Sequence, residues 1–281
     1  MKTILLPFHD EEAGRTAVEA AAFIVQRYDG FLQGLLVQEG PHVSFGRNMP
    51  VPAEYLAQAV RQWREFAASA REHFFALTRD RGMVPGEIES AGAGPMAAWR
   101  EVEGRESQVV GEYGRLFDLI VVGRSGEQAA VRWEETCEAA LFETGRPILL
   151  AARRSRMALG EHIIIAWNGS TETARTVALA SPLLTAASSV TVLTVEGGMV
   201  PGPSGAELAA HLRRTGVAAD GLRVSAEGRT VGEAILETCE ERGADLLVKG
   251  AYTRSRLRQI VFGGATEHVM RWARLPVFLA H

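Results

Sequence analysis

A basic segment followed by two glycines stands near the end of the chain, in VKGAYTRSRLRQIVFGGATEHVM, Val248–Met270. An apolar run ends at Gly250, and Gly263 and Gly264 open a segment with helical spacing. The first turn of a helix carries unpaired N–H groups and a partial positive charge, and glycines let an anion approach the backbone closely. These residue types and spacings indicate a phosphate site. The alternative is a tight helix start with its arginines on a solvated face.

Motifs for catalysis or metal binding are missing from the sequence. It contains no GxSxG, HExxH or CxxC pattern and no Walker lysine. His9 lies beside Asp10 after the first apolar run, where a solvated loop histidine is the simpler interpretation than a base or metal ligand. Asp118 and Asp245 precede apolar strands and are expected to cap backbone N–H groups. We therefore expect no catalytic and no metal-ligating residue, and slow ATP hydrolysis or self-phosphorylation is the weakest alternative.

Composition narrows the class of protein. The chain has 281 residues, a formal net charge of −4 and a pI near 6.0, which argues against general nucleic-acid binding because that affinity comes from accumulated cations. The apolar run at the N-terminus is short and is soon followed by acidic residues. This pattern fits neither a signal peptide nor a membrane span. Cys137 and Cys239 lie in helical patterns and are expected to be buried thiols of a cytoplasmic protein.

The sequence repeats itself. DLIVVGRSG returns as DLLVKGAYT, GRPILLA as RLPVFLA, and TILLPFHDEEAGRTAVEAA as HIIIAWNGSTETARTVALA, in the same order. A duplicated domain explains this order most economically. We predict a first domain over residues 1–153 and a second over residues 160–281, joined in the basic RRSRMALGEH around Arg153–His162.

Apolar strands and amphipathic helices alternate within each half. The expected strands of the second half include Ile163–Trp167, Ser189–Val195 and Leu222–Glu227. The expected helices include Ala53–Arg81 in the first half and Thr171–Leu184, Gly205–Arg214, Val231–Arg242 and Thr266–Ala273 in the second. Continuous apolar strands between helices predict an α/β fold of two tandem, doubly wound domains, each with a parallel sheet of about five strands. Ligands of such sheets bind at the carboxyl ends of the strands.

The glycine segment resembles the carboxyl-terminal motif of the universal stress protein family: glycine, two residues, glycine, nine residues, glycine, then glycine or serine. Gly250 matches the first glycine, Thr253 replaces the second, and nine residues separate Thr253 from Gly263. The resemblance covers the chain as two tandem copies, and it implies ATP or AMP in the second copy, with Mg possible beside ATP. Carried over by position, the implied contacts are Ala166, Trp167, Asn168, Val195, Lys249, Gly250, Tyr252, Thr253, Gly263, Gly264, Ala265 and Thr266.

Three of these positions depart from the family pattern. Asn168 replaces the usual Asp and changes the available donors and acceptors. Trp167 either stacks on a base or fills the pocket itself. Thr253 stands in place of a glycine, which costs about 1–2 kcal/mol if the position needs a left-handed backbone. Lys249 either belongs to the site or points outward from its strand.

The first copy lacks the second pair of glycines. Counted back from the proline of the last strand, Glu134 and Glu135 stand where the second copy has Gly263 and Gly264. Two carboxylates repel a phosphate, although glutamates also simply favour a helix N-terminus. Both interpretations predict no triphosphate site in the first copy.

Two functions of different classes follow. The first is a cytoplasmic tandem universal stress protein that senses or stores an adenine nucleotide and acts in stress response through regulation or partner binding. The second is a nucleotide-free interaction scaffold, because the resemblance implies association through the last strands, Pro147–Ala151 and Pro276–Ala280, within the chain and in a homodimer. The long segment Gln38–Tyr55 either covers a pocket or dimer face or is a surface excursion. No nucleic-acid or membrane partner is expected.

Overall fold

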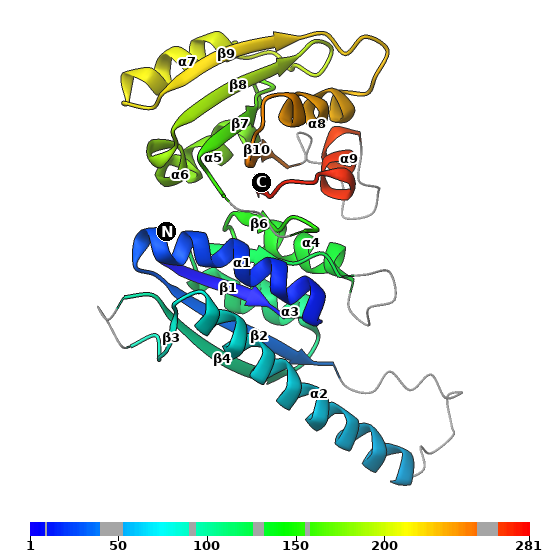
Figure 1. Cartoon of the computed structure of the whole chain (residues 1–281). Helices are drawn as coiled ribbons and strands as arrows, with labels where there is room; N and C mark the ends of the chain where they lie inside the picture. The colour runs from blue at the N-terminus through cyan, green and yellow to red at the C-terminus, as the bar shows by residue number, and fades with distance from the viewer. Residues whose placement is uncertain (9, 40–52, 90–93, 126–131, 155–157, 252–263) are drawn as a thin grey trace. The chain divides into compact units, whose positions relative to one another are not determined.

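A computed structural model describes residues 1–8, 10–39, 53–89, 94–125, 132–154, 158–251 and 264–281. Internal contacts divide the chain into a first unit, Met1–Thr144, and a second unit, Gly145–His281. Each unit is an α/β structure built on a mainly parallel sheet (Figure 1). No helix within the described ranges is both long enough and apolar enough to cross a membrane.

The first unit has five parallel strands in the order β3-β4-β2-β1-β5, with helices on both faces of the sheet (Figure 1). Its strands are β1 Thr3–Pro7, β2 Phe31–Gln38, β3 Val84–Pro85, β4 Met96–Glu103 and β5 Leu119–Val122. Its helices are α1 Glu11–Tyr28, α2 Ala53–Asp80, α3 Glu106–Tyr113, the short 3-10 turn Gly114–Leu116, and α4 Trp133–Glu143.

The second unit repeats this arrangement with the order β6-β11-β10-β7-β8-β9. Its strands are β6 Ile148–Leu150, β7 His162–Ala166, β8 Ser189–Val195, β9 Ala219–Val224, β10 Leu246–Gly250 and β11 Val277–Ala280. Its helices are α5 Thr171–Leu179, α6 Ser181–Ala186, α7 Gly205–Arg214, α8 Val231–Glu241 and α9 Ala265–Trp272. All pairings are parallel except that of β6 with β11, which is antiparallel, with Val277 opposite Leu150. The two last strands, expected from the resemblance to associate, therefore do pair.

Local sequence explains where the helices of the second unit begin. Ser204 and Glu207 form a reciprocal capping box at α7, and Thr230 and Glu233 form the same arrangement at α8. Each pair satisfies backbone N–H groups that the first helical turn leaves without intrahelical partners. These serine and threonine caps fix the helices between buried strands and so repeat the predicted alternation.

Two boundaries differ from the sequence-based expectation. The helix predicted over Thr171–Leu184 is two helices, α5 and α6, because Pro182 occupies the first turn of α6, where a proline begins a helix more readily than it continues one. The strand predicted over Leu222–Glu227 instead spans Ala219–Val224, because β9 pairs with β8 from Val190 opposite Ala219 to Val195 opposite Val224. Neither change alters the order of the elements.

Both cysteines are buried and form no disulfide, as expected. Burial raises the pKa of the Cys239 thiol to about 12. Burial also raises the pKa of Cys137, with Arg124 opposing the shift and nearby glutamates adding to it. Both thiols are therefore protonated at neutral pH and serve as core side chains.

Candidate functional site

The switch point in strand order of the second unit lies between β7 and β10. The chain runs from β7 outward to β8 and β9, whereas β10 is followed by β11 on its other side. Ala166 at the end of β7 lies directly opposite Lys249 of β10 and Leu193 of β8. Gly250 ends β10 and Val195 ends β8. The structure therefore gathers the predicted residues of all three strands at the edge where doubly wound sheets bind ligands.

Asn168 orders the turn between β7 and α5. Its Oδ1 accepts hydrogen bonds from the backbone N–H of Ser170 at 3.1 Å and from Thr173 Oγ1 at 2.7 Å. The Ser170 hydroxyl in turn accepts from the Thr173 N–H at 3.2 Å and caps α5. Gly169 between them has a φ of 82°, which glycine adopts without strain. The side-chain oxygen of Asn168 thus stabilises the turn through hydrogen bonds within the protein.

Trp167 is a buried ring whose polar atom is already satisfied. Only 5% of it is exposed, its backbone N–H donates to the Leu193 carbonyl, and its Nε1–H donates to the Pro203 carbonyl at 2.8 Å. In the first unit, Phe8 makes the equivalent backbone bond to Leu35 and is 1% exposed. Both units therefore place a buried aromatic ring after their first strand, which favours the pocket-filling role of Trp167 over stacking on a base.

Gly250 is required by helix packing. A β-carbon on this residue would lie 2.6 Å from the backbone N and 2.7 Å from Oγ1 of Thr173, in the first turn of α5. The first unit shows the same device, because a β-carbon on Gly123 would collide with the Ala13 carbonyl in α1. A glycine needed in both units, including the one with no glycine pair, is explained by the close approach of helix and strand. Gly250 is thus not evidence for phosphate by itself.

Replacement of Gly250 by alanine is expected to lower the free energy of unfolding of the second unit by about 1–3 kcal/mol, because backbone atoms must move to admit the new methyl group. Gly123→Ala is expected to cost a similar amount in the first unit. Urea unfolding followed by hydrogen exchange would measure both. A neutral Gly123→Ala beside a costly Gly250→Ala would instead indicate a role specific to the second unit.

Lys249 points into the protein. It is 8% exposed, and its Nζ donates to the Gly250 carbonyl at 2.8 Å and to Thr266 Oγ1 at 2.7 Å. The outward orientation considered from sequence is wrong, because Thr266 supplies a buried polar partner from the first turn of α9. Burial lowers the pKa of the Lys249 ammonium to about 8. A charged group at the carboxyl edge is therefore tied to the start of a helix.

The start of α9 completes the described part of the site. Gly264 has a φ of 65° and a ψ of −127°, and no side-chain hydrogen bond caps this helix. Ala265 is half-buried and Thr266 is 5% exposed. Uncapped N–H groups at a helix N-terminus attract anions. The predicted contacts Tyr252, Thr253 and Gly263 lie outside the described residues, as do His9 and most of the segment Gln38–Tyr55.

The residues of the first unit that align with Lys249, Thr266, Gly263 and Gly264 are apolar or acidic. Alignment of DLIVVG with DLLVKG sets Val122 opposite Lys249, and the spacing to the last-strand proline sets Cys137 opposite Thr266. Val122 and Cys137 are both buried, with no exposed surface. Glu134 and Glu135 stand in the first turn of α4. The first unit therefore lacks the lysine and threonine at these aligned positions, and its buried cation at this edge is Arg124, which follows Gly123 and opposes the rise in the pKa of Cys137.

Asp118 and Asp245 act as caps at the opposite edge, as predicted. Asp118 accepts hydrogen bonds from the backbone N–H groups of Lys2 and Thr3 at 2.7 and 3.1 Å. Asp245 accepts from three successive backbone N–H groups, those of Gly160, Glu161 and His162, at 2.9–3.1 Å. Burial opposes ionisation of Asp118, but these hydrogen bonds and the N-terminal ammonium outweigh it and lower its pKa. Both carboxylates are structural.

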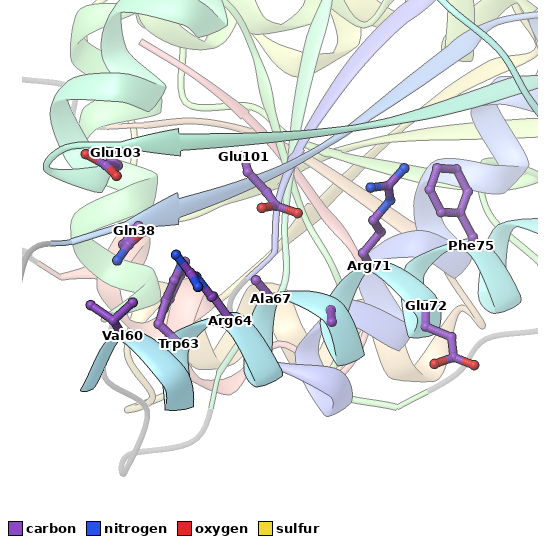
Figure 2. Close-up of a pocket in the computed structure, with 11 residues that line it drawn as sticks. Gln38, Val60, Trp63, Arg64, Ala67, Arg71, Glu72, Phe75, Glu101 and Glu103 are labelled. Carbon is purple, nitrogen blue, oxygen red and sulfur yellow. The ribbon is translucent and has the colours of Figure 1, made fainter. Parts of the chain in front are cut away.

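A second cavity, which sequence reasoning missed, lies in the first unit between α2 and the ends of β2 and β4 (Figure 2). Its volume is about 690 Å³. Figure 2 shows Arg64 and Arg71 pointing from α2 toward the strands and Glu101 pointing from β4 toward the helix. Glu72 and Glu103 also line it, so three glutamates oppose two arginines and the lining carries no surplus of positive charge for an anion. Two arginines seven residues apart within an apolar helical stripe were the available sequence signal.

Metal binding has no support in the described ranges, where no group of three or more His, Cys, Asp or Glu side chains is placed to hold an ion. The groups described at the carboxyl edge of the second unit are an ammonium, a hydroxyl and the N–H groups of the first turn of α9.

Comparison with known proteins gives a family and a fold. Residues 161–281 match the universal stress protein family. A universal stress protein from Archaeoglobus fulgidus DSM 4304 is similar over 99% of this chain and 97% of its own, with 16% identity and a TM-score of 0.68. A functionally unknown protein from Pseudomonas aeruginosa PAO1 is similar over 100% and 92%, with 14% identity and a TM-score of 0.55. No curated protein matches the chain. At these identities the structural likeness is one of fold.

Proposed function

Because residues 161–281 match the universal stress protein family and the two units share the fold of a solved universal stress protein, we propose that the second unit binds an adenine nucleotide, ATP or AMP. Binding would report the nucleotide to a protein partner, in the cytoplasm and as part of a stress response. Mg would accompany ATP. No covalent chemistry is assigned to the site.

The observation that supports this proposal most strongly is the gathering of predicted contacts at the switch point. Ala166 and Lys249 are paired neighbours, and Lys249 is bonded to Thr266 at the start of α9. An anion here would meet the N–H groups of the first turn of α9, whose N-cap Gly264 has no side chain, and the buried Val195 ends the neighbouring strand β8. Trp167 and Asn168 hold the turn after β7 in place through hydrogen bonds within the protein.

Replacement of Gly263 by glutamate tests the assignment, because it copies the acidic residue Glu134 of the first copy. A carboxylate about 4 Å from a phosphate charge costs about 1–4 kcal/mol, depending on the local dielectric. We expect the affinity for ATP to fall at least tenfold in calorimetric titration, with an unchanged melting temperature.

The matched control is Glu134→Gly in the first copy, which is expected to leave ATP affinity unchanged. Equal ATP affinity of the Gly263→Glu variant and the unmodified protein would refute the site. Loss of affinity in both variants would mean that the second unit alone does not carry the binding.

A nucleotide-free scaffold is the alternative, and one observation favours it. Trp167 and the oxygen of Asn168, two of the implied first-strand contacts, find their hydrogen-bond partners within the protein and require no ligand. Under this alternative the repeated order of strands serves partner binding alone, and ATP has no measurable affinity for the chain.

A further inference from the structure

Lys249 is a buried cation whose described partners are both uncharged. Its Nζ contacts only the Gly250 carbonyl and Thr266 Oγ1, and no carboxylate of the described ranges forms an ion pair with it. Burying an unpaired charge is costly, because water is replaced by a few neutral oxygens. A site that holds such a charge can recover the cost when an anion arrives.

The fold itself does not need this lysine. Val122 fills the aligned position of the first unit and Cys137 fills the position aligned with Thr266, and both are fully buried. An apolar pair thus packs this place well in a unit of the same architecture. Packing of this architecture therefore does not require a lysine and a threonine at these two positions, although the first unit also holds a buried cation, Arg124, close to Cys137.

The choice of lysine over arginine is itself unusual in this chain. Of its 30 basic Lys and Arg residues, only Lys2 and Lys249 are lysines. Lysine is a compact charge that can lose its proton when buried, whereas arginine stays charged. Lys249 thus places at the carboxyl edge of the second unit a buried side chain whose charge can respond to a ligand.

Thr266 holds the Lys249 ammonium at the start of α9. Because its Oγ1 accepts a hydrogen bond from the Lys249 ammonium, its own hydroxyl hydrogen points elsewhere and is available to an acceptor. The hydroxyl lies in the first turn of α9, next to backbone N–H groups that the N-cap Gly264 has no side chain to cap. Ammonium, hydroxyl and helix terminus therefore lie together at one end of the helix.

We propose that Lys249 is the charge-recognition residue of the second unit, and that with Thr266 and the first turn of α9 it selects ligands by their phosphate groups. The inference rests on the proposed nucleotide site for its location, and it names the phosphate as the recognised part of that ligand. The bound anion stabilises the protonated amine, so phosphate binding takes up a proton above neutral pH.

Other charged groups surround the site and must be separated from Lys249. Those on α5, on α9 and after β11 are Glu172, Arg175, Glu267, His268, Arg271 and His281. Arg175 donates to the His281 carbonyl, and Arg271 pairs with Glu267 at 3.7 Å. All of them remain in a Lys249→Met variant, so a difference between that variant and the unmodified protein reports Lys249 alone.

The test uses the scarcity of lysine. A Lys2→Arg variant of the full chain retains one lysine side chain, and its Cε resonance can be followed by NMR with labelled lysine from pH 6.5 to 11. Without ligand the midpoint is expected near pH 8. With saturating ATP or inorganic tripolyphosphate it is expected to rise by at least one pH unit, equivalent to a tenfold preference of the ligand for the charged amine.

Affinity gives the second readout. Lys249→Met is expected to weaken ATP and tripolyphosphate binding at pH 7 at least tenfold while its melting temperature does not fall, since Val122 shows that an apolar side chain fits. An unchanged NMR midpoint on ligand binding, or equal affinities in the variant, would overturn the proposal. The nucleotide function fails separately, if ATP binds no more tightly than tripolyphosphate.

Discussion

Phe74→Ala is expected to lower the free energy of unfolding of the first unit by about 3–5 kcal/mol, the usual cost of truncating a fully buried aromatic ring. Phe74 has no exposed surface, and its ring centroid lies 5.2 Å from that of Trp99 and 6.3 Å from that of Phe8. A β-carbon on Gly34 would lie 2.8 Å from the Phe74 ring, so strand β2 packs directly on it. The lost ring therefore leaves a cavity that the backbone cannot close.

Hydrogen exchange measured by mass spectrometry on peptides of the first unit resolves this loss from events in the second. Phe66→Ala on the same helix is the matched control, because Phe66 is 39% exposed, and it is expected to cost less than about 1 kcal/mol. ATP affinity is expected to be unchanged in both variants. A cost below 1 kcal/mol for Phe74→Ala would show that this aromatic cluster does not hold the first unit together.

Lys249→Met is expected to make the ligand-free protein more stable at pH 7. The difference between the ordinary lysine pKa of 10.5 and about 8 corresponds to about 3 kcal/mol of burial cost. The variant also loses two hydrogen bonds, worth about 0.5–1.5 kcal/mol each. The net gain at pH 7 is therefore about 1–2 kcal/mol.

The gain depends on pH in a defined direction. The pKa of Lys249 is lower in the folded than in the unfolded protein, so the unfolded state binds more protons between about pH 8 and 10.5. The stability contribution of Lys249 accordingly rises with pH across this window, whereas methionine does not titrate. The variant's advantage should shrink above pH 8 and reverse at about pH 9, with a total change of about 3 kcal/mol once the pH has passed 10.5.

Urea unfolding at pH 7, 8, 9 and 10.5 measures this change, and Lys2→Met is the control because Lys2 is exposed. Its effect should stay within about 0.5 kcal/mol at every pH. A Lys249→Met variant that is less stable than the unmodified protein at pH 7, by an amount that does not change with pH, would contradict this prediction. The lysine would then stabilise the fold even without a ligand.

The order of strands and helices was predictable because each signal is local. Apolar runs such as those of β5 and β10 mark buried strands, and Ser204 and Thr230 mark helix starts. The repeat then supplied the tandem architecture. Boundaries were less predictable, because β9 begins where β8 pairs with it, and that register depends on the neighbouring strand.

The site was predictable in position but not in the roles of its residues. Gly250 was interpreted as part of a phosphate loop, yet its missing β-carbon makes room for Thr173, a contact that no local motif announces. The inward direction of Lys249 depends on Thr266, 17 residues later in the sequence. Such contacts arise only when the helices pack on the sheet, so a pattern along the chain cannot contain them.

The most direct test of the nucleotide claim begins with freshly purified full-length protein. After denaturation, the released small molecules are identified and quantified by chromatography and mass spectrometry, and protein without ligand is then titrated with Mg-ATP and AMP. The account predicts an adenine nucleotide at a ratio approaching one per chain, either carried through purification or bound in the titration. No released nucleotide and no binding of either ligand would contradict it and leave partner binding as the function of the chain.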